Sequence, residues 1–179
     1  TVQATTDLAM AIEGTDILFL LYDAGGFSAY DQDFKTATRF GIDLCVGDTS
    51  GPTGIMKALR NVSVLADIAE QVHRTAPECL IINYVNPMAV MIMSAERLGL
   101  HNIVGICGGV RATHNTIARC LEIDERELST RFAGINHMCW ALDIKRNSDD
   151  YYPQFRELMM RPEWTEAEPA RSEVLQHFG

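Results

Sequence analysis

Residues 16–26 are Asp16-Ile17-Leu18-Phe19-Leu20-Leu21-Tyr22-Asp23-Ala24-Gly25-Gly26, and this stretch decides the fold class of the chain. Ile17–Tyr22 is a solid apolar run in which hydrophobic residues do not alternate with polar ones. Such a run, with β-branched and aromatic side chains, is typical of a strand that is buried on both faces of a parallel sheet. The run ends in Asp23–Gly26, where glycines allow a tight turn and a close approach of the backbone to a ligand.

Two later apolar runs, Cys79–Tyr84 and Asn102–Cys107, have the same character and are predicted to be further buried strands. Apolar residues recur at helical spacing between and around these runs. The predicted helices cover 8–12, a segment that reaches Phe40, 55–72, 88–98, 113–121 and 124–129. Because strands alternate with helices, the sequence predicts an α/β fold with a parallel sheet.

The last part of the chain has a different pattern. Residues 132–137 and 139–145 are predicted to be extended, and Asn147–Asp150 is predicted to be a turn. From Pro153 onward the pattern is helical and amphipathic, with one weak break at Arg161-Pro162-Glu163.

Charge and apolar content exclude several classes of protein. The chain has 179 residues, 47% of them hydrophobic, which is enough for one full-sized core and excludes a disordered chain. Its 24 acidic and 15 basic residues give a net charge of −9, which argues against non-specific binding to nucleic acid or anionic membrane. No apolar run approaches the ~18 residues of a membrane helix, and no signal peptide is visible at Thr1. We therefore expect no nucleic-acid partner and no membrane partner.

The cysteines indicate the redox environment. They are five in number, irregularly spaced and without a Cys-x-x-Cys pair: Cys45, Cys79, Cys107, Cys120 and Cys139. This pattern predicts thiols rather than disulfides, a reducing compartment and hence a cytoplasmic protein. Most of the cysteines are expected to be buried among apolar side chains.

Polar residues follow each predicted strand, at the edge where ligands bind in such sheets. Asp23–Gly26 follows the first strand, Asn86 follows the second directly before Pro87, and Cys107 ends the third. Each alone has an ordinary structural explanation, namely a tight turn, an Asn-Pro turn and a core cysteine. His137, alone most simply a satisfied polar residue, lies in the polar segment Gly134–Met138. A thiolate and an imidazole are half of a ligand set for a divalent transition metal, although their separation fits no zinc-finger spacing.

Taken together, these motifs resemble those of glycoside hydrolase family 4. The matching segments follow the family's order at about its spacing, and they are Gly47–Arg60, Asn83–Ala89, Val104–Cys107, Ala133–Met138, Arg146–Pro153 and Glu173–Gly179. The resemblance covers essentially the whole chain. It implies a fold related to the lactate and malate dehydrogenases. We therefore expect residues 1–130 to be the C-terminal part of a Rossmann-like dinucleotide-binding domain, and residues 131–179 to begin an α+β domain for substrate and metal.

The resemblance also implies an activity. Family members hydrolyse glycosides with NAD and a divalent metal, usually Mn²⁺, outside the two-carboxylate mechanism of most glycosidases. The sugar is oxidised at C3, loses the C2 proton, eliminates the glycosidic oxygen, takes up water and is reduced again. The Asn-Pro-Met-Ala motif and the lack of a basic cluster for phosphate point to small unphosphorylated α-galactosides or α-glucosides. Family members are usually dimers or tetramers, so we expect a homo-oligomer.

The same resemblance assigns site residues. It implies that Cys107 and His137 bind the metal, that Asn86 and Asn136 bind the sugar, and that the turn of Asp23, Ala24, Gly25 and Gly26 lies against the dinucleotide. It assigns no catalytic base. Cys107 and His137 are therefore expected to lie close enough to share one ion, and Asn86 to face the same cleft as Cys107. Apart from the resemblance, the sequence around Asp48 predicts that it caps its own loop, with a reach into the site through that Gly-rich loop as the alternative, and His114 is expected to be a solvated helix residue.

The sequence departs from the family in three places. No Gly-x-Gly-x-x-Gly is present, Gly108 stands where the family has His, Asp or Asn, and the expected base would follow Gly179. The chain is therefore expected to be an internal piece that shows no glycosidase activity alone. Two alternatives remain open. Gly108 and the truncation favour a non-catalytic module that binds sugar or a partner chain. A 2-hydroxy acid dehydrogenase would use Arg111 and His137 but would leave Cys107 without a purpose.

Overall fold

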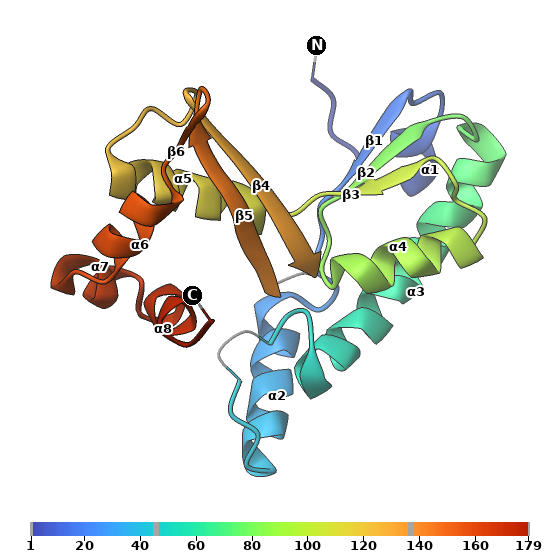
Figure 1. The fold of residues 1–179 in the computed structure, drawn as a ribbon. Coiled ribbons are helices and arrows are strands. Elements are labelled where there is room, and N and C mark those ends of the chain that lie inside the picture. The colour runs from blue at the N-terminus through green and yellow to red at the C-terminus, as the bar shows by residue number, and fades with distance from the viewer. Residues whose placement is uncertain (1, 45–46, 136–137, 179) are drawn as a thin grey trace. The chain divides into compact units, whose positions relative to one another are not determined.

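The computed structural model describes residues 2–44, 47–135 and 138–178, and the chain divides into two compact units. Unit 1 is residues 1–107 and unit 2 is residues 108–179. Each unit has its own sheet and its own core (Figure 1). Within the described ranges, no helix is both long enough and apolar enough to span a membrane.

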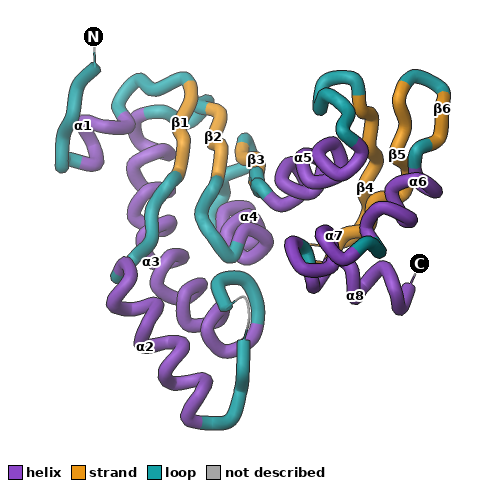
Figure 2. Tube along the Cα trace, turned by 90° about the vertical axis from the view of Figure 1, so that its left-hand side faces the viewer, coloured by secondary structure: helices purple, strands orange, loops and turns teal. Residues whose placement is uncertain are grey.

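Unit 1 is built on a parallel sheet. Its strands are β1 (Ile17–Leu20), β2 (Leu80–Asn83) and β3 (Ile103–Gly105), in the spatial order β1-β2-β3. Its helices are α1 (Leu8–Ile12), α2 (Gly26–Arg39), α3 (Gly51–Thr75) and α4 (Met88–Arg97). Figure 2 shows the strands joined through helices, as the predicted α/β fold requires.

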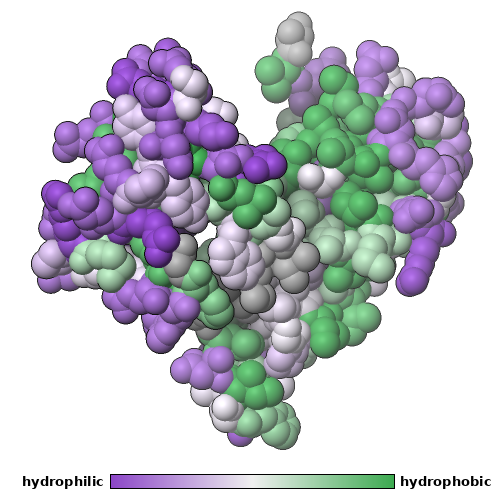
Figure 3. Space-filling model, viewed as in Figure 1, coloured by the Kyte–Doolittle hydropathy of each residue, from purple (hydrophilic) through white to green (hydrophobic). Residues whose placement is uncertain are grey.

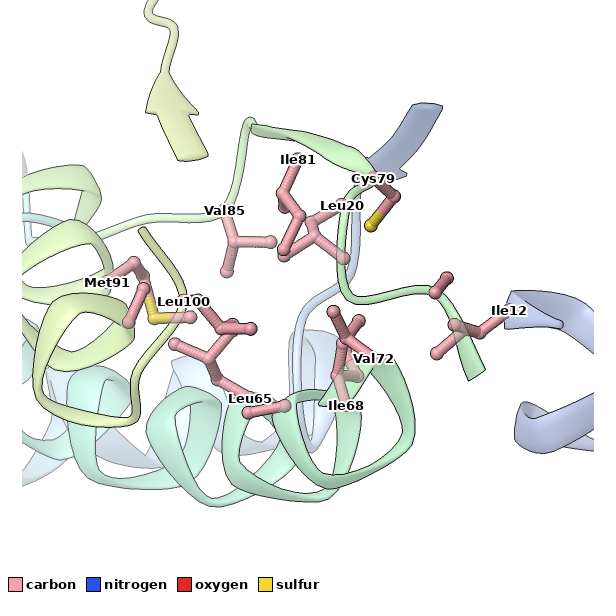
Figure 4. Close-up of a cluster of buried hydrophobic side chains, with 13 residues drawn as sticks. Ile12, Leu20, Leu65, Ile68, Val72, Cys79, Ile81, Val85, Met91 and Leu100 are labelled. Carbon is pink, nitrogen blue, oxygen red and sulfur yellow. The ribbon is translucent and has the colours of Figure 1, made fainter. Parts of the chain in front are cut away.

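The core of unit 1 lies between one face of this sheet and three helices. Figure 4 shows Leu20 of β1 and Ile81 of β2 facing Leu65 and Val72 of α3, with Met91 of α4 at one end of the cluster. These side chains are at most 3% exposed. Alternate residues of the strands pack against α1, α3 and α4. The side of each of these helices that faces the sheet is therefore apolar.

The expectation that the first strand is buried on both faces is wrong for this chain. The side chains of Ile17, Phe19 and Leu21 are 60%, 50% and 69% exposed. Leu18 and Leu20, one residue out of step, face the core, because successive side chains of a strand point to opposite faces. The space-filling view shows hydrophobic residues gathered over the part of unit 1 that holds the sheet and α4 (Figure 3).

Unit 2 is a helix, an antiparallel sheet and a helical tail. The helix is α5 (Gly109–Leu121), and the strands β4 (Leu128–Ile135), β5 (Met138–Arg146) and β6 (Asp149–Asp150) lie in sequence order. The tail is α6 (Tyr152–Met159), α7 (Pro162–Ala167) and α8 (Pro169–Phe178). Ile117, Leu121, Leu128 and Ile144 form the core of this unit.

Several element boundaries differ from the prediction. Helix α3 begins at Gly51 rather than residue 55, since Pro52 lies in the first turn, where its missing N–H is not needed. Helix α5 begins at Gly109 rather than residue 113. The predicted helix at 124–129 is wrong, because Glu122 ends α5 in the left-handed region and the Asp124 side chain accepts from the Arg126 N–H at 2.9 Å, closing a turn before β4.

Candidate functional site

The carboxyl ends of β1, β2 and β3 meet at one edge of the unit 1 sheet, because the strands are parallel neighbours. The ladder continues slightly past the strands, with the Tyr84 N–H on the Leu20 carbonyl and the Ile106 N–H on the Asn83 carbonyl, both at 2.9 Å. Beyond these bonds the chain leaves the sheet in three segments. These segments hold Asp23–Gly26, Asn86 and Cys107, as the sequence predicted for their positions at the strand ends.

The turn after β1 needs its glycines for two different reasons. Gly25 has φ +85°, and a Cβ placed there would lie 2.6 Å from the Cβ of Ala29. Gly26 has φ +56°, with nothing within 4 Å of a Cβ placed there. Gly25 is thus required by packing and by its left-handed conformation, whereas Gly26 is required by its left-handed conformation alone and borders open space. The turn therefore offers backbone that a ligand can approach closely.

Arg60 of α3 fixes this turn from one side. Its guanidinium binds the nearly buried carboxylate of Asp33 with two hydrogen bonds of 3.1 and 2.6 Å, and its Nε donates to the Ala24 carbonyl at 3.1 Å. The hydrogen bond to Asp33 raises the pKa of Arg60. Arg60 thus joins α2, α3 and the turn.

Charged and aromatic groups lie beside the same turn. Lys57 Nζ is 3.2 Å from Asp23 Oδ2 and 5.3 Å from the centre of the Tyr30 ring. Burial, followed by the charges of Asp48 and Asp23, raises the pKa of the Tyr30 hydroxyl. Tyr30 is therefore a neutral hydroxyl at physiological pH.

Asn61, the next residue of α3, reaches two of the strand ends. Its Oδ1 accepts from the Ala24 N–H and its Nδ2 donates to the Asn86 carbonyl, both at 2.8 Å. Its own carbonyl accepts from the Tyr22 hydroxyl at 2.9 Å, and burial raises the pKa of Tyr22 to about 12. Sequence reasoning missed Asn61, although a polar residue between Ala58 and Leu65 on the apolar stripe of α3 was a visible signal.

Asn86 lies just beyond β2, and its peptide bond to Pro87 is cis. Its Nδ2 donates to Asp48 Oδ2 at 2.6 Å. A carboxylate only accepts hydrogen bonds, so the amide of Asn86 points its nitrogen at Asp48 and keeps Oδ1 as its remaining acceptor. Asp48 thus acts outside the loop that it was expected to cap. The shared cleft with Cys107 stays a prediction.

The predicted metal pair falls partly outside the described residues. Cys107 is exposed, two residues beyond β3, and forms no disulfide. His137 and Asn136 lie outside the described residues, so their roles stay predictions. Within the described part of the chain, no three His, Cys, Asp or Glu side chains gather as a metal site.

The other cysteines that the structure describes are partly buried and partly exposed. Cys79 is buried, which raises the pKa of its thiol, and Cys120 is buried, which raises the pKa of its thiol to about 11. Cys139 is exposed.

The expectation that His114 is solvated is wrong, because its ring is half-buried and bonds to Thr130 Oγ1 at 2.8 Å and to the Glu125 carbonyl at 3.0 Å. Arg111, which the dehydrogenase alternative would need, donates to Glu125 at 3.3 Å.

Comparison with known proteins identifies the family. A family model described as "Family 4 glycosyl hydrolase" matches residues 1–123, and one described as "Family 4 glycosyl hydrolase C-terminal domain" matches residues 132–179. The chain belongs to glycosyl hydrolase family 4. The predicted resemblance is thereby confirmed.

Relatives of this family 4 chain are longer than it is. An alpha-galactosidase of Rhizobium meliloti (strain 1021) is 34% identical over a compared length of 184 residues. The comparison covers 99% of this chain and 37% of that protein. The chain therefore spans less than half the length of this curated relative.

Solved structures support the fold. A 6-phospho-alpha-glucosidase from gut microorganisms, in complex with NAD and Mn²⁺, superposes with a TM-score of 0.86 at 22% identity, covering 97% of this chain and 43% of that one. A lactate dehydrogenase from Eimeria maxima, with NADH and oxamate, superposes with a TM-score of 0.61 at 14% identity, covering 95% and 47%. At these identities the likeness shows the fold alone, and it confirms the Rossmann-like α/β class of the family 4 chain.

Proposed function

We propose that this family 4 chain is part of a glycosidase that cleaves O-glycosidic bonds of small α-glycosides by oxidation and elimination, using NAD and Mn²⁺ or another divalent metal. The observation that carries the proposal is the match of both family 4 models, which together leave only a short gap in the chain. The alpha-galactosidase relative at 34% identity supports an unphosphorylated α-galactoside as substrate.

The residues at the strand ends fit a dinucleotide. Gly26 leaves open space beside the backbone, and Arg60 and Asn61 hold the Ala24 peptide groups in place. Asp23, Ala24, Gly25 and Gly26 would therefore lie against the dinucleotide. A nicotinamide dinucleotide held there would supply an acceptor and donor of hydride for C3 of the sugar.

The side-chain chemistry of the two proposed ligands suits a divalent transition metal. Cys107 would supply a thiolate and His137 an imidazole, a combination that such ions accept. A metal held by these two residues would supply a Lewis acid for oxygens of the sugar, which would make the C2 proton more acidic. Asn86 would accept a hydrogen bond from a sugar hydroxyl through Oδ1, since its nitrogen is directed to Asp48. Asn136 is proposed as a second sugar-binding residue.

The proposal also covers the domain boundaries, the oligomeric state and the cellular location of the protein. We infer that residues 1–130 belong to the dinucleotide-binding domain and residues 131–179 to the beginning of the substrate and metal domain. The first family model ends at 123 and the second begins at 132, which supports this boundary, while the compact units divide at 107. We propose a homo-oligomer from the family, a cytoplasmic location from the cysteine pattern, and no nucleic-acid or membrane partner from the acidic composition.

A protein that carries this chain with the flanking regions of its relatives tests the function. We expect NAD⁺- and Mn²⁺-dependent release of nitrophenol from nitrophenyl α-galactoside or α-glucoside. In D₂O the released sugar should carry deuterium at C2, because that proton is removed and replaced from solvent. Nitrophenol release without deuterium at C2 would contradict the elimination route.

Gly108 favours one alternative, a non-catalytic module. Glycine has no side chain that can transfer a proton, and it follows the proposed metal ligand directly. Binding of Mn²⁺ or sugar without nitrophenol release would support this alternative. Reduction of pyruvate or oxaloacetate would instead support a 2-hydroxy acid dehydrogenase.

A further inference from the structure

Asn61 is a fully buried polar side chain in an apolar stripe. It lies on α3 between Ala58 and Leu65 and is 0% exposed. An apolar side chain at this position would continue the stripe, whereas a buried amide destabilises the fold unless it is hydrogen-bonded. Both halves of the Asn61 amide are hydrogen-bonded, at 2.8 Å each.

The partners of Asn61 belong to two different strand ends. The Ala24 N–H lies 37 residues earlier in the chain, and the Asn86 carbonyl lies 25 residues later. Neither bond belongs to a helix or to the sheet ladder. The Asn61 amide thus joins the turn after β1 to the segment after β2 through one rigid plane.

Neighbouring bonds stiffen this link. The Ala24 carbonyl accepts from Arg60 Nε, so both polar backbone groups of Ala24 are held by consecutive residues of α3. On the other side, the Asn86 carbonyl is held by Asn61 while the Asn86 amide is held by Asp48. A shift of the turn after β1 therefore has a direct route to Asn86.

We propose that Asn61 is a positioning residue that sets the distance between the dinucleotide turn and the sugar-binding Asn86, so that the two move as one unit. This inference rests on the proposed function for its biological meaning. The physical link itself needs neither ligand, and it can be tested on the 179-residue chain alone.

Two variants separate the halves of the link. Asn61→Asp keeps size and the acceptor for Ala24 but replaces the donor to Asn86 by a second acceptor. Asn61→Leu removes both bonds and leaves an apolar side chain, so it remains informative if the buried charge of Asn61→Asp prevents folding. Leu65→Ala is the control for loss of stability in the same helix. Asn102→Asp is the control for losing side-chain bonds to carbonyls, those of Glu78 and Cys79, at the opposite edge of the sheet.

Nuclear magnetic resonance with hydrogen exchange gives the readout. We expect the Ala24 amide to exchange at least tenfold faster in Asn61→Leu than in Leu65→Ala, once both are corrected for overall stability. In Asn61→Asp the Ala24 amide should stay protected while the Asn86 side-chain signals shift. Equal exchange of Ala24 in the parent chain and in Asn61→Leu would overturn the proposal.

A second experiment tests whether a change in the turn after β1 reaches Asn86 through Asn61. Asp23→Asn removes the ion pair of the turn with Lys57. We expect it to shift the Asn86 side-chain signals in the parent chain and in Asn102→Asp, but not in the Asn61→Leu background. An equal shift in the Asn61→Leu background, or no shift in the parent chain, would overturn the coupling. Because no ligand is added, a failed glycosidase assay would refute the proposed function and leave this inference standing.

Discussion

The hydrogen bond from Asn86 to Asp48 sets the chemistry that a single side chain can offer. An amide can turn either its nitrogen or its oxygen toward a ligand, and the two orientations select opposite partners. The 2.6 Å hydrogen bond directs the nitrogen toward Asp48 and leaves Oδ1 as the acceptor. The sugar-binding role proposed for Asn86 therefore depends on Oδ1 accepting a hydrogen bond from a hydroxyl.

Replacing Asn86 by Ala should lower turnover by about 10²-fold in the complete glycosidase, the effect of removing one oriented hydrogen-bonding group at a reacting centre. The melting temperature should change little by comparison, because the backbone carbonyl of Asn86 still bonds to Asn61. Asn102→Ala, at the other edge of the sheet, is the control and should keep full activity. Unchanged turnover in Asn86→Ala would show that Asn86 is only a turn residue.

Cys107 and His137 are the proposed metal ligands, and replacing either one tests the proposal. Cys107→Ser and His137→Ala should each weaken Mn²⁺ binding by tenfold or more, because each removes one protein ligand from the proposed pair. Electron paramagnetic resonance of free Mn²⁺ measures this in the absence of substrate. Cys139→Ser is the matched control, since Cys139 is also an exposed cysteine. Equal Mn²⁺ affinity in all three variants would exclude the proposed pair.

An ion pair between Asp33 and Arg60 joins α2 to α3. Asp33 of α2 is 3% exposed and Arg60 of α3 is 28% exposed at the side chain, with oxygen and nitrogen 2.6 Å apart. Because Arg60 also donates to the Ala24 carbonyl, the ion pair between the two helices supports the turn after β1. Helix packing and site geometry are thus joined at Arg60.

Asp33→Ala should lower the free energy of unfolding by roughly 3–5 kcal/mol, because it leaves the Arg60 guanidinium without its partner. The double variant Asp33→Leu/Arg60→Met should recover most of that loss, since an apolar pair of similar size often replaces a buried ion pair at little net change. Urea unfolding of the three proteins measures both effects. A double variant less stable than Asp33→Ala would contradict this explanation.

One face of the unit 1 sheet is apolar and exposed. Ile17, Phe19 and Leu21 project from one side of β1, and Tyr84 and Val104 continue the apolar surface on the neighbouring strands, at 43% and 45% exposure. Neighbouring apolar side chains exposed on one sheet face are typical of a contact face or of a chain that tends to associate. Figure 3 shows how hydrophobic this part of unit 1 is.

The 179-residue chain should therefore elute well above its 19.9 kDa mass in size-exclusion chromatography with light scattering. Phe19→Lys/Leu21→Lys should shift it toward the monomer without changing its circular dichroism, because both side chains point away from the core. Leu142→Lys, an exposed apolar position on β5 of unit 2, is the control and should leave the elution volume unchanged. A monomeric parent chain would contradict the prediction.

The α/β class, the three strands of unit 1 and the position of Asp23, Asn86 and Cys107 at the strand ends could all be predicted from the sequence. These features follow from local patterns, since apolar runs, glycines and helical spacing act through neighbouring residues. The sequence also carried the family, through motifs spread along the chain.

Only the tertiary structure decided the partners of those residues. That Asn61 bonds to both Ala24 and Asn86, that Asp48 orients the Asn86 amide, and that His114 is held by Thr130 all depend on contacts between segments distant in sequence. The same holds for the exposed face of β1, because an apolar strand reads alike whether one face or both are covered. Local pattern sets which way a side chain points along its own element, and the packing of elements sets what it meets there.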